Sequence, residues 1–93
     1  MDKGELWENQ VFRILADKYG MDSVFFWRTS AGNEIDFVLP DIEKPKAIEV
    51  KFDEAQVKPN KYKLFTDVYP EIPLKFVWFH PFANHFFKNL AEL

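Results

Sequence analysis

Two short apolar segments that each contain acidic residues place the strongest constraint on how this chain folds. The first is Glu-Ile-Asp-Phe-Val-Leu at 34–39, and the second is Lys-Ala-Ile-Glu-Val-Lys-Phe at 46–52. Both are too short for typical helices and are rich in β-branched and aromatic residues, which favours strands. Pro40 ends the first segment and a polar loop at 41–45 follows it. We therefore expect two neighbouring strands that pair as a hairpin.

Further elements are predicted on both sides of this hairpin. Apolar residues recur at helical spacing over 4–19, which predicts an amphipathic helix. The other expected elements are a strand at 24–28, a turn at 29–33, a helix at 60–68, a strand at 74–79 and a helix at 82–93. The order αβββαβα predicts an α/β fold with a mixed four-stranded sheet flanked by helices. Parallel pairing of the last two strands would require a right-handed crossover.

Composition limits the class of protein. A chain of 93 residues is expected to form a single domain. It contains no cysteine, which excludes disulfide scaffolds, thiol catalysis and cysteine-based zinc sites. No apolar run is long enough for a membrane span, so we expect a soluble, cytoplasmic protein without a membrane partner. Aromatic residues make up 18% of the chain, and this surplus is compatible with a homodimer.

The alternation of side chains along the two strands predicts which residues share a face. In the first strand, we expect Ile35, Phe37 and Leu39 on one face, and Glu34, Asp36 and Val38 on the other. In the second strand, Glu49 and Lys51 lie opposite the apolar side. Pairing with the apolar faces aligned would bring Asp36 and Glu49 together, with their Cβ atoms about 4.5–5.5 Å apart.

Two carboxylates at this spacing are suited to share one divalent cation. Hard oxygen ligands completed by water favour Mg²⁺ or Mn²⁺ over Zn²⁺. Lys51 would orient or activate a bound water and offset charge on an attacked phosphate. The alternative is that these charges form the solvated face of a half-buried sheet. Apolar residues on both sides of the charges place them close to the core, where repelling carboxylates require a cation or a shifted pKa.

Three motifs in this order resemble the PD-(D/E)XK nuclease superfamily. They are Lys-Gly-Glu-Leu-Trp-Glu-Asn at 3–9, Gly-Asn-Glu-Ile-Asp-Phe at 32–37 and Ala-Ile-Glu-Val-Lys at 47–51. Two branches are similar: the nuclease-like C-terminal domain of archaeal and bacterial AAA-type ATPases, and the archaeal Holliday-junction resolvases. The resemblance covers residues 3–79 and implies a restriction-endonuclease-like αβββαβ core.

The resemblance also implies roles for individual residues. Asp36 and Glu49 match the carboxylates that bind Mg²⁺ or Mn²⁺, and the backbone carbonyl of Val50 would be a further ligand. Lys51 matches the catalytic lysine. Glu8 matches a helix glutamate that supports the metal or the water. An ATPase domain in the parent polypeptide is a further implication.

The sequence departs from the superfamily pattern and leaves some acidic residues open. Ile35 stands where many relatives have proline before Asp36, and the Gln-x-x-x-Tyr motif of some relatives is absent. Glu8 could instead serve the helix dipole, with Glu5 as the alternative site residue. Glu34 would either bind a second metal or face water, and we favour the second.

Several residues are candidates for contacts with DNA phosphates, or else belong to an ordinary solvated surface. They are Arg28, Ser30, Lys58, Lys61 and Lys63. Two histidines, His80 and His85, lack companion ligands and are expected to be structural or surface residues.

The leading hypothesis is a Mg²⁺- or Mn²⁺-dependent DNA endonuclease, with low sequence specificity, that acts as a homodimer on duplex or branched DNA. An alternative is a catalytically inert nuclease-fold module from an ATPase-linked protein that binds a partner or DNA. A purely structural homodimerisation domain is a third. The chain lacks Gly-x-x-x-x-Gly-Lys-Ser/Thr, so it is not the ATP-hydrolysing part of an ATPase by that mechanism.

Overall fold

The computed structural model describes residues 3–78 of the chain. Its regular elements are α1 (Lys3–Tyr19), β1 (Phe25–Arg28), β2 (Glu34–Leu39), β3 (Lys46–Lys51), α2 (Lys63–Val68) and β4 (Leu74–Trp78), with 3-10 helices η1 (Met21–Ser23), η2 (Glu54–Gln56) and η3 (Pro59–Tyr62). This order confirms the predicted elements up to 78. The helix predicted at 82–93 and both histidines lie outside the described residues. Within 3–78, no helix has the length and apolar character needed to cross a bilayer.

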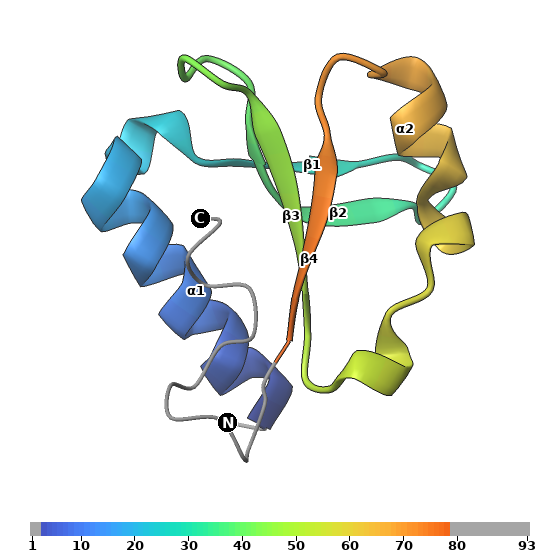
Figure 1. Ribbon diagram of the computed structural model, residues 1–93, viewed down its shortest axis with the longest axis horizontal. Helices are drawn as coiled ribbons and strands as arrows, with labels where there is room; N and C mark the ends of the chain where they lie inside the picture. Colours follow the sequence, from blue (N-terminus) through green and yellow to red (C-terminus); the bar gives the residue numbers. More distant parts are fainter. Residues whose placement is uncertain (1–2, 79–93) are drawn as a thin grey trace.

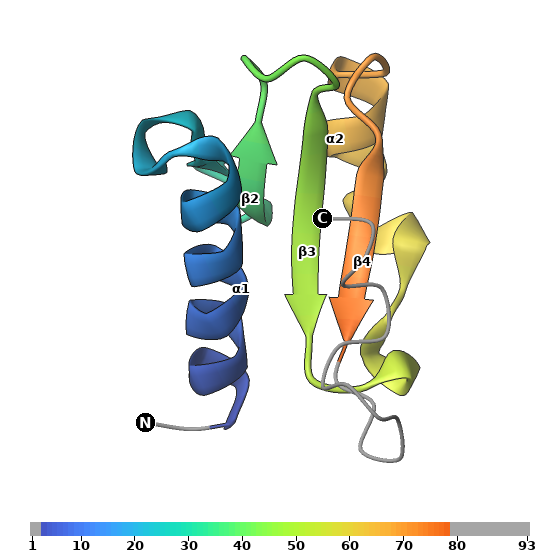
Figure 2. The ribbon, with the colours of Figure 1, turned by 60° about the vertical axis from the view of Figure 1, so that its left-hand side comes forward.

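The four strands form one mixed sheet in the order β1-β2-β3-β4. The β1–β2 and β2–β3 pairs are antiparallel, and β3–β4 is parallel, from Ala47 opposite Leu74 to Lys51 opposite Trp78. The segment containing η3 and α2 connects the two parallel strands. Helix α1 covers one face of the sheet and α2 lies on the other (Figure 1 and Figure 2). The predicted α/β class and mixed four-stranded sheet are confirmed.

The sheet is packed on both faces. Helix α1 presents a buried apolar stripe, as its sequence spacing predicts, and this stripe meets one face of the sheet. The residues of this first core cluster are Trp7, Val11, Leu15, Phe37, Leu39, Ile48 and Val77. The second cluster, on the α2 face, consists of Ile35, Val38, Ala47, Tyr62, Phe65 and Ile72. Both clusters draw residues from β2 and β3, so these central strands are held between two layers.

A β-bulge in β2 corrects the face assignment made from sequence alternation. Opposite β1, Val38 pairs with Phe25 and Ile35 pairs with Trp27, so β2 has one residue more than β1 between these pairs. The extra residue reverses the alternation at Asp36. Ile35 therefore packs with Val38 in the α2 cluster, whereas Phe37 remains in the α1 cluster. The prediction was wrong for Ile35, whereas Phe37 and Leu39 do share one face, opposite Val38.

The segment predicted as a helix at 60–68 forms in two parts. Pro59 is at the start of the 3-10 helix η3, where its missing N–H costs no hydrogen bond. Tyr62 has φ −107° and ψ 18°, which are not helical values, and α2 begins after it. Tyr62 and Phe65 are the buried residues of this segment. Each part thus contributes one aromatic side chain to the α2 cluster.

Replacing Leu15 with alanine is expected to destabilise the fold by about 2–5 kcal/mol, because it removes buried methyl groups and leaves a cavity. Leu15 has no exposed surface, whereas Leu6 on the same helix is 55% exposed. Leu6→Ala is the matched control and should change the free energy of unfolding by about 0.5 kcal/mol or less. Urea unfolding of the two variants measures both values. Equal losses would contradict the placement of α1 on the sheet.

Candidate functional site

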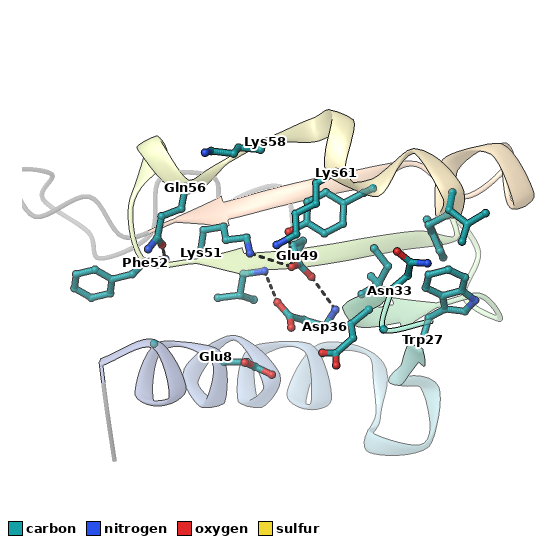
Figure 3. Close-up of a pocket in the computed structure, with 18 of the residues that line it drawn as sticks. Glu8, Trp27, Asn33, Asp36, Glu49, Lys51, Phe52, Gln56, Lys58 and Lys61 are labelled. Atoms are coloured by element: carbon teal, nitrogen blue, oxygen red, sulfur yellow. Dashed lines mark hydrogen bonds and ion pairs between the residues drawn. The ribbon is translucent and has the colours of Figure 1, made fainter. Parts of the chain in front are cut away.

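An open pocket of about 920 Å³ lies beside the ends of β2 and β3. Asp36 from β2 and Glu49 and Lys51 from β3 line its centre, and Glu8 on α1 faces them from one wall (Figure 3). The opposite wall comes from the segment between β3 and α2. The pocket therefore collects charged side chains from four separate parts of the sequence.

The two central carboxyl groups lie where β2 and β3 separate. Regular pairing of these strands runs from Leu39 opposite Lys46 to Phe37 opposite Ile48. Beyond it, Asp36 Oδ2 accepts a hydrogen bond from the Val50 N–H at 2.8 Å, and Glu49 Oε1 accepts one from the Asp36 N–H at 3.0 Å (Figure 3). Each carboxyl thus binds the main chain of the opposite strand. The bulge in β2 lies at this point of the strand, between Ile35 and Val38.

Glu49 is a buried acid with several partners. It is 6% exposed, the one charged or polar residue of 3–78 found buried. Its Oε2 accepts a hydrogen bond of 2.8 Å from the Tyr62 hydroxyl and lies 3.3 Å from Lys51 Nζ. With the Asp36 N–H on Oε1, both oxygens are engaged. These bonds offset the cost of burying a carboxylate, which is otherwise large.

The pKa of Asp36 is raised to about 8. Burial is the main cause, and repulsion from Glu49 is the next; the hydrogen bond from Val50 opposes both, and Glu8 adds further repulsion. A side-chain hydrogen bond to Glu49 also favours the protonated form. At neutral pH the pair is therefore protonated on Asp36 when no cation is present. This is the behaviour of two acids that share either a proton or a cation.

Lys51 is held as a cation beside this pair. Burial acts to lower its pKa, but the interactions with Tyr62 and Glu49 outweigh it, and the net pKa is raised. The ammonium also lies over the Tyr62 ring, 5.7 Å from its centroid. Lys51 is consequently a hydrogen-bond donor and a positive charge at neutral pH, not a base.

Other acids surround the centre at greater distance. Burial raises the pKa of Glu8, with added repulsion from Glu49, Glu34 and Glu5. Glu34 lines the pocket but is more than half exposed and lies 3.5 Å from Arg28 Nε. Glu5 is exposed on α1 and is not among the residues that line the pocket.

Some of the candidate DNA-contact residues line the pocket, and others do not. Lys58 and Lys61 line the pocket. Lys63 points elsewhere and pairs with Asp67 at 2.8 Å on the exposed side of α2. Arg28 lines a smaller neighbouring hollow, and Ser30 lines neither.

Tyr62 is the site residue that sequence reasoning missed. In the sequence, Tyr62 and Gln56 are too far apart for a Gln-x-x-x-Tyr motif, and no other role was expected of Tyr62. A buried glutamate needs hydrogen-bond donors, and the spacing of Tyr62 to Phe65 would have indicated an inward-facing tyrosine. Gln56 also lines the pocket, and its Oε1 accepts a hydrogen bond from the Phe52 N–H at 2.9 Å.

Replacing Tyr62 with phenylalanine is expected to destabilise the fold by about 1–3 kcal/mol, because Glu49 loses a donor in a buried site. Tyr69→Phe is the matched control: its ring packs on Trp27 and Phe65, and its hydroxyl has no hydrogen bond within residues 3–78. The control should change stability by about 0.5 kcal/mol or less. Denaturant unfolding measures both, and a cost for Tyr62→Phe no larger than the control would show that Glu49 does not depend on the hydroxyl.

A divalent cation requires a set of ligand atoms, and the acidic side chains at the centre of the pocket supply oxygen atoms only. Within 3–78, no three His, Cys, Asp or Glu side chains are grouped to hold one ion. The candidate ligands at the centre of the pocket are therefore the carboxyl groups of Asp36 and Glu49, next to the main chain of β3. Mg²⁺ usually keeps several waters and binds through one or two carboxylates, so this oxygen-only set fits it and does not fit Zn²⁺.

Comparison with known proteins gives one match. The sequence model of the family described as "Domain of unknown function (DUF4143)" matches residues 3–81. No curated protein and no solved structure matches the chain. The matched range includes every element described above.

Proposed function

The chain belongs to the DUF4143 family, and we propose that its pocket is the site of a divalent-metal-dependent nuclease that hydrolyses DNA phosphodiesters. The observation that carries this proposal is the meeting of two carboxyl groups, Asp36 and Glu49, at the fork between β2 and β3, with Lys51 Nζ 3.3 Å from Glu49. The resemblance to PD-(D/E)XK nucleases supports the same roles.

Asp36 and Glu49 would hold Mg²⁺ or Mn²⁺, with the Val50 carbonyl as a further ligand implied by the resemblance. The bound ion would supply charge stabilisation at the phosphate and lower the pKa of water. Lys51 would donate to a phosphate oxygen and offset the charge that develops there. In the reaction, a bond forms between the water oxygen and phosphorus, an ester P–O bond breaks, and the leaving oxygen takes up a proton.

Glu8 is suited to accept the proton from the attacking water. Its carboxylate faces the centre from α1, and its raised pKa makes it a stronger base than an exposed glutamate (Figure 3). Lys58 and Lys61 would bind flanking phosphates at the opposite wall of the pocket.

The direct test is DNA cleavage by the purified chain. Supercoiled, single-stranded and four-way-junction DNA would be incubated with Mg²⁺, Mn²⁺ or EDTA. Metal-dependent cleavage is expected for the wild type and for Lys63→Ala, a lysine paired with Asp67 outside the pocket. Lys51→Ala should lose it. Wild-type cleavage no faster than that of Lys51→Ala on every substrate would reject the proposal.

A second candidate is an inert nuclease-fold module that binds DNA or a partner, such as an ATPase domain in the same polypeptide. The observation that favours it is that both carboxyl groups already have partners within the protein. Tyr62, Lys51 and main-chain N–H groups bind Glu49 and Asp36. Calorimetry distinguishes the two. Heat of Mn²⁺ binding that disappears in Glu49→Gln supports the nuclease, and no binding heat in the wild type supports the inert module.

A further inference from the structure

The pocket extends past the carboxyl groups to an aromatic end. Trp27 and Asn33 lie at this end, whereas Phe52 and Gln56 lie at the other (Figure 3). Phe65 and Ile35 line the pocket near Trp27. Neither the sequence motifs nor the proposed chemistry assigns a role to this region.

Trp27 is held firmly next to the centre. It pairs with Ile35, the residue before Asp36 on β2, and paired Cα atoms in antiparallel strands lie about 4.5–5.5 Å apart. Its ring makes edge contacts with Phe65 and Tyr69, at centroid distances of 5.2 and 6.4 Å. Trp27 is partly exposed. A firmly packed, partly exposed indole therefore stands at one end of the pocket, on the strand next to the one that carries Asp36.

Asn33 adds a polar group at the same end. The loop before it is ordered by two hydrogen bonds between Thr29 and Asn33, at 2.9 and 3.1 Å, and by Gly32, whose φ of 93° suits glycine. Within residues 3–78, the Asn33 side chain makes no hydrogen bond of its own. Its amide has both donors and an acceptor, which match the edge of a nucleobase.

We propose that this aromatic end binds one unstacked base of a single-stranded DNA segment, so that the substrate of the pocket is single-stranded or locally unpaired DNA. The inference rests on the proposed function for its phosphate position. The base would contact Trp27 and hydrogen-bond with Asn33, while the strand passes over the carboxyl pair toward Lys58 and Lys61. In a duplex each base is stacked between its neighbours, and its face is not available to a side chain.

Lys58 and Lys61 account for affinity for DNA but not for a preference for single-stranded or unpaired DNA. Phosphate contacts are largely independent of sequence and of the presence of a base. An aromatic contact contributes about 1–3 kcal/mol per base, which corresponds to roughly 5–150-fold in affinity. Binding should therefore depend on the base at the aromatic end and on salt at the lysine wall.

The test measures binding of fluorescein-labelled oligothymidylate of about 12 nucleotides, an abasic strand of equal length and the corresponding duplex, by anisotropy with Ca²⁺ in place of Mg²⁺. The wild type should bind oligothymidylate at least about 5-fold more tightly than either competitor. Trp27→Leu keeps an apolar contact with Phe65. In this variant the affinity for oligothymidylate should be within about 2-fold of the affinity for the abasic strand. Asn33→Ala should lower the affinity for oligothymidylate while leaving that for the abasic strand unchanged.

Phe26→Leu is the matched control, because Phe26 is the next residue on β1 and is 70% exposed, outside this pocket. It should leave the preference unchanged, and melting temperatures of both variants verify folding. Equal wild-type affinity for the three DNAs, or equal effects of Trp27→Leu and Phe26→Leu, would overturn the inference. Base-dependent binding without metal-dependent cleavage would reject the nuclease proposal and support the base site. Metal-dependent cleavage without base-dependent binding would support the nuclease proposal and reject the base site.

Discussion

Replacing Asp36 with asparagine is expected to lower the rate of Mg²⁺-dependent DNA cleavage by at least about 1,000-fold. Asparagine keeps an oxygen that can accept the Val50 N–H, so the fork between β2 and β3 should persist. What is lost is the negative charge that would hold the cation. Initial rates of cleavage of the best DNA substrate, measured in parallel with calorimetric Mn²⁺ binding, give both effects.

Glu34→Gln is the matched control for this change. Glu34 lies on the same strand, lines the same pocket and is more than half exposed, with Arg28 as its neighbour. The control should retain its rate within about 10-fold of wild type. Similar losses in the two variants would indicate a general electrostatic effect of the pocket and would contradict a specific role for Asp36.

The apo-protein is expected to lose stability as the pH rises from about 4 to about 8, and Asp36→Asn is expected to remove most of this loss. The folded-state pKa of Asp36 is about 8 because of burial and the nearby Glu49, whereas the unfolded value is near 3.8. Between these values the folded state holds a proton that the unfolded state does not. The contribution of Asp36 is therefore fully present below about pH 4 and is lost as the pH rises through the folded pKa.

Thermal unfolding from about pH 5 to about pH 9 in EDTA measures this effect as the difference between wild type and variant. A difference of a few kcal/mol would shift the melting temperature by roughly ten degrees or more for a domain of this size. Mg²⁺ should raise the wild-type melting temperature most at the alkaline end, since it replaces the proton, and should not raise that of Asp36→Asn. A pH-independent difference would show that Asp36 is ionised in the apo-fold.

Much of the fold was predictable from local sequence signals. The stripe with Trp7, Val11 and Leu15 predicted a helix with one buried face, and all three residues are buried. The alternating run at 46–51 predicted β3 and placed Glu49 away from Ile48, which is confirmed: Ile48 lies in the α1 cluster, and Glu49 bonds to Tyr62 of the α2 cluster. Short-range patterns succeed here because helix and strand periodicity directly reflect which side chains meet the core.

The bulge in β2 could not be predicted in the same way. The sequence at 34–39 has the alternation of a regular strand, and the extra residue is visible only against its partner β1. The position of the bulge is the one at which Ile35 packs with Val38 and Phe65 on the α2 face of the sheet. This is a long-range packing effect, and it falls at the position of Asp36.

The remaining site residues depend on chain segments that converge only in the folded state. Tyr62 follows Glu49 by 13 positions, and its hydroxyl reaches the carboxylate from the last residue of the 3-10 helix η3. Trp27 reaches the same pocket through β1 pairing. In the sequence, three basic residues have equal claims as DNA contacts; in the fold Lys58 and Lys61 line the pocket, whereas Lys63 pairs with Asp67.

The anomalous scattering of Mn²⁺ in crystals of the full chain tests the central claim most directly. The account predicts a single strong peak at bonding distance from carboxylate oxygens of both Asp36 and Glu49, which is lost in crystals of Asp36→Asn. The absence of a peak between these two residues at saturating Mn²⁺, or a peak that survives in Asp36→Asn, would contradict it.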